Sequence, residues 1–339
     1  MAFSSVVQRH PRYSLLLVLT LIIASFLLFP SSQPPFHKLS EVDYFRKANA
    51  GKSLRAVLDD EERRYQKVLH DREAMVRKWG PTPQQVVAFP PARDFYTLWD
   101  FFIAAFQCPH HVERIGTMGD GGKWVCGIER VARQPECVVY SFGVNGESSF
   151  EAEILTRAPG CQVWGYDFSV NSFGPEITSD PALSSRAHFR PYALGAHDAH
   201  SNNEDPPYYT LQTLMNINGH KFIDILKIDI EGAEFDSLEK FIDDIVKRQS
   251  VVHGARGPEE VVLPIGQLQI EIHARPGSGG HENFANFKIW WEKLESVGLR
   301  PFWTEPNLVY INLVHARPDL SEYSFMNIRG DHALVSDKF

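Results

Sequence analysis

The stretch LKIDIEGAEF, residues 226–235, changes its pattern halfway along. Its first half alternates apolar with charged residues, as a β-strand does, and Gly232 then interrupts the pattern before a helix begins. In a regular strand, Lys227, Asp229 and Glu231 would project to one face. A central parallel strand is covered on both sides, so we expect this charged row to meet counter-charges, a ligand or a metal; an open face in contact with water is the alternative.

Strands and helices alternate on both sides of this stretch. The pattern predicts strands at 137–144, 161–169, 187–195, 223–231, 266–274 and 307–315 and helices at 148–158, 211–218, 235–248 and 284–298. Such an alternation is typical of an α/β domain in which helices cover both faces of a mostly parallel sheet.

The composition narrows the class of protein. The chain has 339 residues, of which 43% are hydrophobic, and carries a formal net charge of -8. It is long enough for one medium α/β domain with additional segments. We expect no nucleic-acid partner, because the composition gives no basic stripe that could follow a phosphate backbone.

The N-terminal part contains an uncharged apolar segment, residues 13–30, preceded by Arg9, His10 and Arg12. This pattern predicts a transmembrane signal-anchor with a cytosolic N-terminus; a cleaved signal peptide and a buried helix are the alternatives. The expected order is a cytosolic tail (1–12), the anchor (13–30), a linker and helical stem (31–84) and the α/β domain (85–339). The chain would then be a single-pass type II membrane protein of the Golgi or endoplasmic reticulum with a lumenal domain, or a secreted protein if the signal is cleaved.

All four cysteines, Cys108, Cys126, Cys137 and Cys161, follow the anchor. An even number can pair in an oxidising lumen, in three possible ways. Buried free thiols are the alternative. Their spacing does not match that of a zinc site.

The ends of the first two strands indicate a nucleoside ligand. In an open α/β sheet, ligands bind beyond the carboxyl ends of the strands, at the point where the topology switches direction. The first strand ends in Gly143-Val144-Asn145-Gly146, a turn that lets the backbone approach a ligand at the start of a helix. Asp167, followed by Phe168, ends the second strand, where an acidic side chain can bind ribose hydroxyls.

Three motifs carry a family resemblance: Arg114-Ile115-Gly116 continued by Gly119-Asp120-Gly121-Gly122-Lys123-Trp124, then Tyr140-Ser141-Phe142-Gly143, then residues 226–232. Together they resemble the FkbM-type methyltransferases, and more specifically their membrane-anchored methyltransferase-like protein 24 group. The resemblance covers about residues 75–325. It implies a class I methyltransferase with a Rossmann-like, mostly parallel seven-stranded sheet that binds S-adenosyl-L-methionine.

The resemblance also implies roles for particular residues. Asp229 and Glu231 would stand at the methyl-transfer site, Asp167 would bind the ribose, and Leu194, at the end of the third strand, would border the adenine. Asp120 and Gly121 belong either to a plain hairpin turn or to a wall beside the cofactor. The expected cofactor-binding set is Asp120, Gly121, Gly143, Val144, Asn145, Gly146, Asp167, Phe168 and Leu194.

Four residues are candidates for the chemistry. The fifth strand repeats the pattern of the fourth, so Glu271 and His273 should emerge beside Asp229 and Glu231. One of these side chains can take the proton of the acceptor as general base. Alternatively, Asp229, Glu231 and His273 hold a divalent metal, or the groups only pair with one another.

The resemblance implies O-methylation of a sugar or other hydroxyl-bearing acceptor, a small molecule or a glycan, and the signal-anchor places it in the secretory lumen. A catalytically silent nucleoside-binding domain tethered to the membrane is the alternative. A glycosyltransferase is less favoured, because the chain lacks the Asp-x-Asp sequence of metal-dependent nucleotide-sugar sites. The acceptor and the oligomeric state are not specified by the sequence.

Overall fold

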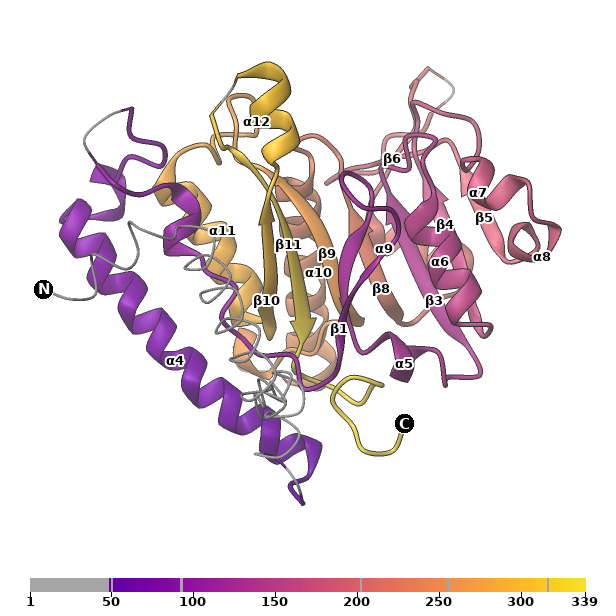
Figure 1. The fold of residues 1–339 in the computed structure, drawn as a ribbon, viewed down its shortest axis with the longest axis horizontal. Helices are drawn as coiled ribbons and strands as arrows, with labels where there is room; N and C mark the ends of the chain where they lie inside the picture. The colour runs from indigo at the N-terminus through magenta and orange to yellow at the C-terminus, as the bar shows by residue number, and fades with distance from the viewer. Residues whose placement is uncertain (1–48, 50, 92–93, 202, 255–256, 316) are drawn as a thin grey trace, which may run out of the picture. The chain divides into compact units, whose positions relative to one another are not determined.

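A seven-stranded sheet forms the centre of the described chain, in the order β10-β11-β9-β8-β3-β4-β5 (Figure 1). Six of these strands run in the same direction, and β11, which lies between β10 and β9, runs in the opposite direction. The strands are β3 (Cys137–Phe142), β4 (Cys161–Tyr166), β5 (Ala187–Arg190), β8 (Ile223–Ile228), β9 (Ile265–His273), β10 (Leu299–Pro306) and β11 (Leu320–Asn327). The prediction of a mostly parallel, Rossmann-like seven-stranded sheet is confirmed.

The computed structural model describes residues 49, 51–91, 94–201, 203–254, 257–315 and 317–339. One compact unit comprises Gly51–Phe339. The expected cytosolic tail and membrane anchor, residues 1–30, lie outside the described residues. Among the helices of the described part, none combines the length and the apolar character needed to cross a bilayer.

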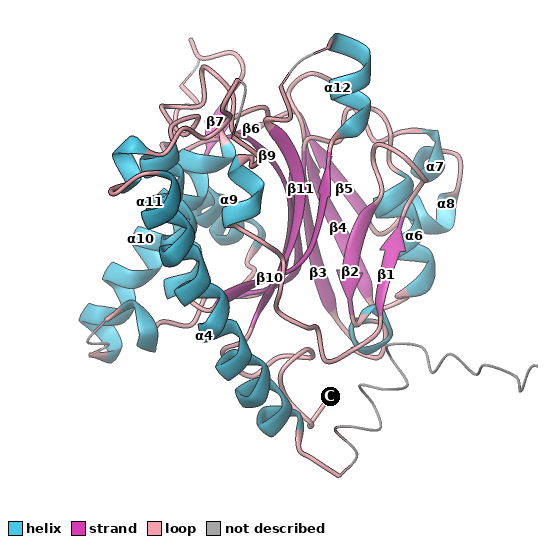
Figure 2. Cartoon of the chain, turned by 60° about the vertical axis from the view of Figure 1, so that its left-hand side comes forward, coloured by secondary structure: helices cyan, strands magenta, loops and turns pink. Residues whose placement is uncertain are grey.

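Helices cover both faces of the sheet (Figure 2). On one side lie α9 (Leu211–Asn218), α10 (Glu234–His253) and α11 (Phe284–Ser296), and on the other lies α6 (Ser149–Arg157) with two short helices. In α10, apolar residues recur three or four positions apart, from Phe235 through Leu238 and Ile242 to Ile245, and all are buried. This spacing gives the helix one apolar face, which packs in the core with the side chains of β8 and β9.

The helix expected in the stem is α4 (Leu54–Trp79), and it packs against the sheet domain. The buried guanidinium of Arg72 donates two hydrogen bonds, of 2.7 and 2.8 Å, to the carboxylate of Glu295 on α11. The hydroxyl of Tyr65 donates to the same carboxylate. Because a buried ion pair is costly to break, α4 is anchored to the domain by these contacts.

Two of the expected strands differ from the structure. Residues 308–314 form helix α12 (Leu308–Val314) instead of a strand, because the side chain of Asn307 caps the helix by accepting a hydrogen bond from the backbone N–H of Tyr310. The expected strand 187–195 divides at Pro191 into β5 and the short β6 (Ala193–Leu194), which pairs with β7 (Tyr208–Tyr209).

The remaining elements are short. A hairpin of β1 (Val112–Ile115) and β2 (Lys123–Cys126) packs on the α6 side of the sheet. The others are η1 (Pro83–Gln85), η2 (Leu98–Phe101), α5 (Ile128–Val131), α7 (Pro175–Thr178), α8 (Pro181–Ser184) and η3 (Pro258–Glu260).

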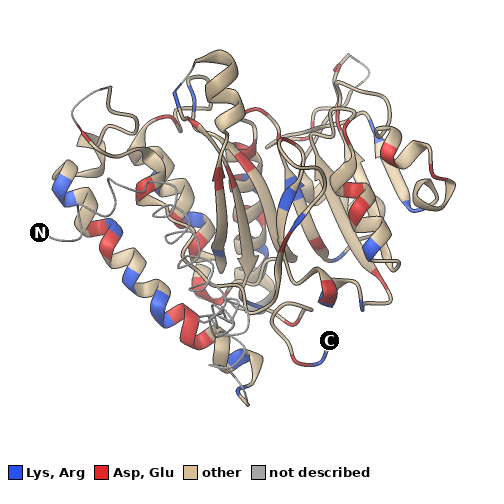
Figure 3. Cartoon of the chain, in the orientation of Figure 1, with Lys and Arg blue, Asp and Glu red and all other residues tan. Residues whose placement is uncertain are grey.

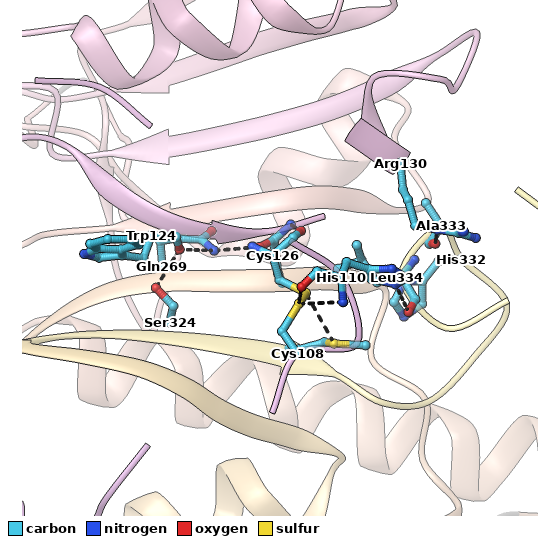
Figure 4. The surroundings of a disulfide bond; sticks show 12 residues. Cys108, His110, Trp124, Cys126, Arg130, Gln269, Ser324, His332, Ala333 and Leu334 are labelled. Carbon is cyan, nitrogen blue, oxygen red and sulfur yellow. Dashed lines mark hydrogen bonds between the residues drawn. A yellow bond between two sulfur atoms is a disulfide. The ribbon is translucent and has the colours of Figure 1, made fainter. Parts of the chain in front are cut away.

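The four cysteines form two disulfides, Cys108–Cys126 and Cys137–Cys161. The first joins the end of β2 to the loop that precedes the hairpin (Figure 4). The second links register partners at the first residues of β3 and β4. Of the three possible pairings, this one connects only segments that already lie side by side.

The burial of His110, next to the first disulfide, predicts that the folded protein loses stability in acid. Its Nε2 lies 2.8 Å from the carbonyl oxygen of Leu334 (Figure 4). Burial lowers the pKa of His110 from 6.5 to about 4. Between pH 6.5 and 4 the unfolded chain therefore binds a proton that the folded chain does not, so stability falls as the pH is lowered through this window.

We expect the protonation of this single group to lower the unfolding free energy by roughly 3 kcal/mol between pH 7 and 4. Urea unfolding at several pH values, compared between the natural protein and His110→Gln, measures this contribution. The variant should show a shallower pH dependence over this window. An identical dependence in both proteins would contradict the assignment.

Candidate active site

The sheet switches direction at β3. From β3 the chain proceeds outward through β4 and β5, and it then returns to build β8 and β9 on the other side of β3. A crevice for a ligand is expected where the two halves diverge, beyond the carboxyl ends of β3 and β8. The residues that follow these strands therefore form the candidate site.

The turn after β3 has a left-handed backbone at three positions. The φ angles are 78° at Gly143, 45° at Asn145 and 72° at Gly146. A side chain at Gly143 would collide with the backbone carbonyl oxygen of Asp229, whereas one at Gly146 would meet no atom within 4 Å. Gly143 thus allows the turn to pack directly on the chain that follows β8.

Asp167, immediately after β4, closes this turn. Its carboxylate accepts hydrogen bonds from the backbone N–H of Asn145, at 2.8 Å, and from the N–H and hydroxyl of Ser169, both at 2.7 Å. The neighbouring side chain of Phe168 is 56% exposed. The structure therefore brings together the turn and the acid that the sequence singled out separately.

Val144 and Leu194 are placed differently. Both side chains are buried in the hydrophobic core, Val144 on the α6 side of the sheet and Leu194 on the side of α9 and α10. Only their backbone atoms remain for contact with a ligand.

Asp120 and Gly121 lie in the turn of the β1–β2 hairpin. A side chain at Gly121 would collide with the carboxylate of Glu147, at the end of the glycine turn. The backbone N–H of Thr117 also donates to the hydroxyl of Ser149 on α6, at 2.8 Å. The segment is a hairpin turn, and it also borders the turn after β3, so the two interpretations of this motif are compatible.

The three charged side chains of residues 226–231 have different surroundings in the structure. Strand β8 ends at Ile228. Lys227 is buried; its Nζ donates to the carbonyl oxygen of Gly143 at 2.8 Å and lies 3.6 Å from Glu151 Oε1 on α6. Glu231, with φ of 62°, turns outward, is 70% exposed and pairs with Arg275. The expectation that all three charges project from one strand face is wrong for Glu231, because the strand ends before it.

Asp229, Glu271 and His273 form one cluster, and an oxygen or nitrogen of each lies within 4.8 Å of the others. Asp229 is 23% exposed at the crevice, whereas Glu271 and His273 are buried. Lys123 on β2 lies 3.7 Å from the Asp229 carboxylate and also pairs with Glu322 on β11. Figure 3 shows acidic residues at the strand ends beneath α12. It also shows basic residues on the adjoining β1–β2 hairpin.

Neighbouring charges shift the pKa values within the cluster. Burial raises the pKa of Asp229, but Lys123, Lys227 and His273 outweigh burial and hold it below its usual value. Burial, together with the charges of Asp229 and Glu322, raises the pKa of Glu271 to about 8. Burial lowers the pKa of His273, but its hydrogen bond to Glu234 and nearby carboxylates raise it to about 9.

Three residues that interact with the cluster were not predicted from the sequence: Glu234, Glu322 and Asn307. The buried carboxylate of Glu234 lies 3.1 Å from His273 Nδ1, and the amide of Asn307 donates to Glu271 at 2.6 Å. Glu234 stands in the motif after Glu231, so its position offered a signal. Glu322 and Asn307 offered none, because the strand that carries Glu322 was not predicted and Asn307 was assigned to a strand.

A hollow of about 520 Å³ lies between α4, α11 and η3. Two of the arginines that line it are already paired, Arg72 with Glu295 and Arg300 with Glu62. It also lies away from the strand ends where ligands bind in such sheets. The cluster beside the glycine turn is therefore the candidate active site.

The strand order of the sheet, with its switch point at β3, defines a Rossmann-like α/β protein. The chain belongs to the family described as "Methyltransferase domain", whose model matches residues 57–316. This finding confirms the expectation of a class I methyltransferase.

Curated relatives agree with this family. The probable methyltransferase-like protein 24 of Rattus norvegicus is 29% identical over 210 residues, which cover 58% of this chain and 47% of that protein. The Homo sapiens protein of the same name is 30% identical over 198 residues, 56% of this chain and 45% of that protein. The match thus spans about half the length of these relatives, and it confirms the expected similarity to the methyltransferase-like protein 24 group.

Solved structures match at lower similarity. Fibrillarin from Methanococcus jannaschii aligns with a TM-score of 0.33 and 14% identity, covering 66% of this chain and 73% of that one. An O-methyltransferase family protein from Burkholderia thailandensis aligns with a TM-score of 0.27 and 13% identity, covering 60% and 56%.

The packing of Gly143 on Asp229 predicts a difference between two glycines of the same turn. Gly143→Ala should lower the unfolding free energy by more than about 3 kcal/mol, because a left-handed backbone and a collision add together. Gly146→Ala should cost only about 1 kcal/mol, because the left-handed backbone is its only penalty. Urea unfolding of both variants measures the contrast, and equal losses would show that the close contact with Asp229 is not rigid.

Proposed function

We propose that this chain is an S-adenosyl-L-methionine-dependent O-methyltransferase that acts on a sugar or another hydroxyl-bearing acceptor, a small molecule or a glycan. The observation that carries the proposal is the junction of the glycine turn, Asp167 and Asp229 at the switch point of the sheet. Membership of the methyltransferase family supports the reaction class.

The cofactor would lie across the turn after β3. Each oxygen of the Asp167 carboxylate has two lone pairs, so the three hydrogen bonds from Asn145 and Ser169 leave one acceptor position, on Oδ2, for a ribose hydroxyl. Phe168 offers an exposed ring beside this position. The open space above Gly146 lets the methionine part approach the backbone.

Methyl transfer is an in-line displacement at the sulfonium. The acceptor oxygen bonds to the methyl carbon while the carbon–sulfur bond breaks, S-adenosylhomocysteine leaves, and a base takes the hydroxyl proton. Asp229 suits the role of base, because its carboxylate is partly exposed at the crevice while Glu271 and His273 are buried behind it. Glu231 is 70% exposed and pairs with Arg275, and its carboxylate lies 3.5 Å from His273 Nε2.

Two features support a lumenal location. The apolar segment 13–30 follows basic residues, as in a signal-anchor, and the two disulfides suit an oxidising compartment. We therefore propose a membrane-anchored enzyme of the Golgi or endoplasmic reticulum. The net charge of -8 supports a small acceptor in preference to a nucleic acid.

Calorimetric titration of the full-length protein with S-adenosyl-L-methionine tests the cofactor. We expect micromolar binding that Asp167→Asn weakens at least tenfold, because the amide accepts fewer hydrogen bonds and carries no charge. Asp180→Asn is the matched control, since Asp180 also accepts hydrogen bonds from backbone N–H groups but caps the distant α8. UDP-sugars and NAD serve as control ligands.

Failure of a folded protein to bind S-adenosyl-L-methionine would contradict the proposal, and binding of a UDP-sugar would favour the glycosyltransferase alternative. Equal weakening by both aspartate variants would mean that Asp167 acts only through the fold.

Asp229→Asn separates binding from chemistry. We expect the transfer of labelled methyl to acceptor hydroxyls to fall about 100-fold or more, because the amide cannot take a proton. Cofactor affinity should change less than threefold. Unchanged turnover would remove Asp229 from the mechanism, and cofactor binding without turnover by the natural protein, over a broad acceptor panel, would indicate the silent binding domain.

A further inference from the structure

Two short segments of the chain bring three possible metal ligands close together. Glu271 and His273 stand two residues apart on β9, so their side chains emerge on the same face of the strand. Asp229 follows the neighbouring strand β8, and the three side chains offer ligand atoms within 4.8 Å of one another. Two ligands of one small divalent cation lie about 3 to 4.2 Å apart, so closure by about half an ångström completes the site.

His273 is held in the orientation of a metal ligand. Its Nδ1 lies 3.1 Å from Glu234 Oε1, and its backbone N–H donates to the same oxygen at 2.8 Å. The other oxygen of Glu234 accepts from the backbone N–H of Gly232 at 2.7 Å. A carboxylate behind the imidazole is the usual second partner of a histidine that binds a metal through its other nitrogen.

That other nitrogen is buried and has no partner. The side chain of His273 is 1% exposed, and its Nε2 makes no hydrogen bond within the described residues. The nearest carboxylate oxygens are those of Glu231, at 3.5 Å, and Glu271, at 3.9 Å. A buried polar atom without a partner is costly, and it points into the space between the carboxylates.

Carboxyl groups outnumber ammonium groups around the space that His273 Nε2 faces. The carboxylates of Asp229, Glu271 and Glu322 surround the single ammonium of Lys123. Lys227, the other buried ammonium nearby, is bonded to Gly143 and faces Glu151. Carboxyl oxygens, which are ligands of divalent cations, therefore outnumber the ammonium groups in this space.

We propose that Asp229, Glu271 and His273 Nε2 bind one divalent transition-metal ion, of which Mn²⁺ is representative, with Glu234 as the group that orients His273. Two oxygen ligands and one imidazole favour such an ion over Ca²⁺ or Mg²⁺. The cation replaces the Nε2 proton and leaves coordination positions open toward the crevice. Glu231, which the sequence suggested as a ligand, is replaced by Glu271. The role of the ion rests on the proposed function: it would bind the acceptor hydroxyl and lower its pKa, and Asp229 would then act as a ligand of the ion in place of a direct base. The binding of the ion does not rest on the proposed function.

The test uses full-length protein stripped with EDTA and titrated with Mn²⁺ in the absence of any cofactor. Electron paramagnetic resonance of free Mn²⁺ gives the stoichiometry and affinity, and electron spin echo modulation detects a bound imidazole nitrogen. We expect one ion per chain, at least tenfold weaker binding in Glu271→Gln and His273→Gln, and loss of the nitrogen signal in His273→Gln. Glu239→Gln, which removes a carboxylate paired with Lys293 outside the cluster, is the matched control and should change the affinity less than threefold.

Thermal unfolding and circular dichroism establish that each variant is folded. Glu234→Gln, which leaves all three ligands in place, should weaken Mn²⁺ binding by a smaller factor and so provides a second measurement if a ligand variant does not fold. No Mn²⁺ binding by protein that still binds S-adenosyl-L-methionine would overturn the metal site and leave the proposed function intact. Binding that survives the Glu271 and His273 substitutions would overturn this ligand set. Mn²⁺ binding with the expected pattern, without cofactor binding, would support the metal site and contradict the proposed function.

Discussion

The ammonium of Lys227 holds together the two strand ends on which the site depends. It is buried between β3 and α6, where it donates to the carbonyl oxygen of Gly143 and faces the carboxylate of Glu151. A buried charge is tolerated only when it is paired and hydrogen-bonded, so this contact fixes the turn after β3 relative to β8. The absent side chain of Gly143 then lets the turn pack on Asp229. The turn after β3 and the acidic cluster are neighbours for this reason.

The rest of the site is assembled from segments far apart in the chain. The β1–β2 hairpin supplies Lys123, β11 supplies Glu322, and the cap of α12 supplies Asn307. Each of them interacts with a carboxylate of the cluster, either directly or through a neighbour. The acidic groups can therefore lie close together only when the hairpin and the antiparallel strand are both in place.

Much of this arrangement could be predicted from local patterns. The alternation around residues 226–228 gave the central strand, and the glycines and Asp167 gave the switch point. Other features depended on tertiary contacts that a local pattern does not contain. Glu231 leaves the charged row because the backbone turns after Ile228, and Leu194 enters the core because Pro191 divides its strand. Residues 308–314 have strand-forming side chains, but the cap at Asn307 and the contact of Asn307 with Glu271 favour a helix. The pairing of Glu234 with His273 joins residues of two elements, so neither periodicity nor spacing could show it.

The two disulfides lie at the amino ends of the strands, whereas the candidate site lies at their carboxyl ends. Cys137 and Cys161 are the first residues of β3 and β4, and Cys126 lies beside Gln267, near the start of β9. The covalent cross-links therefore brace the amino ends of the strands, whereas the carboxyl ends are joined only by hydrogen bonds and ion pairs. An opening that admits a ligand is therefore expected at the carboxyl ends, while the disulfide between Cys137 and Cys161 keeps β3 and β4 in register at their amino ends.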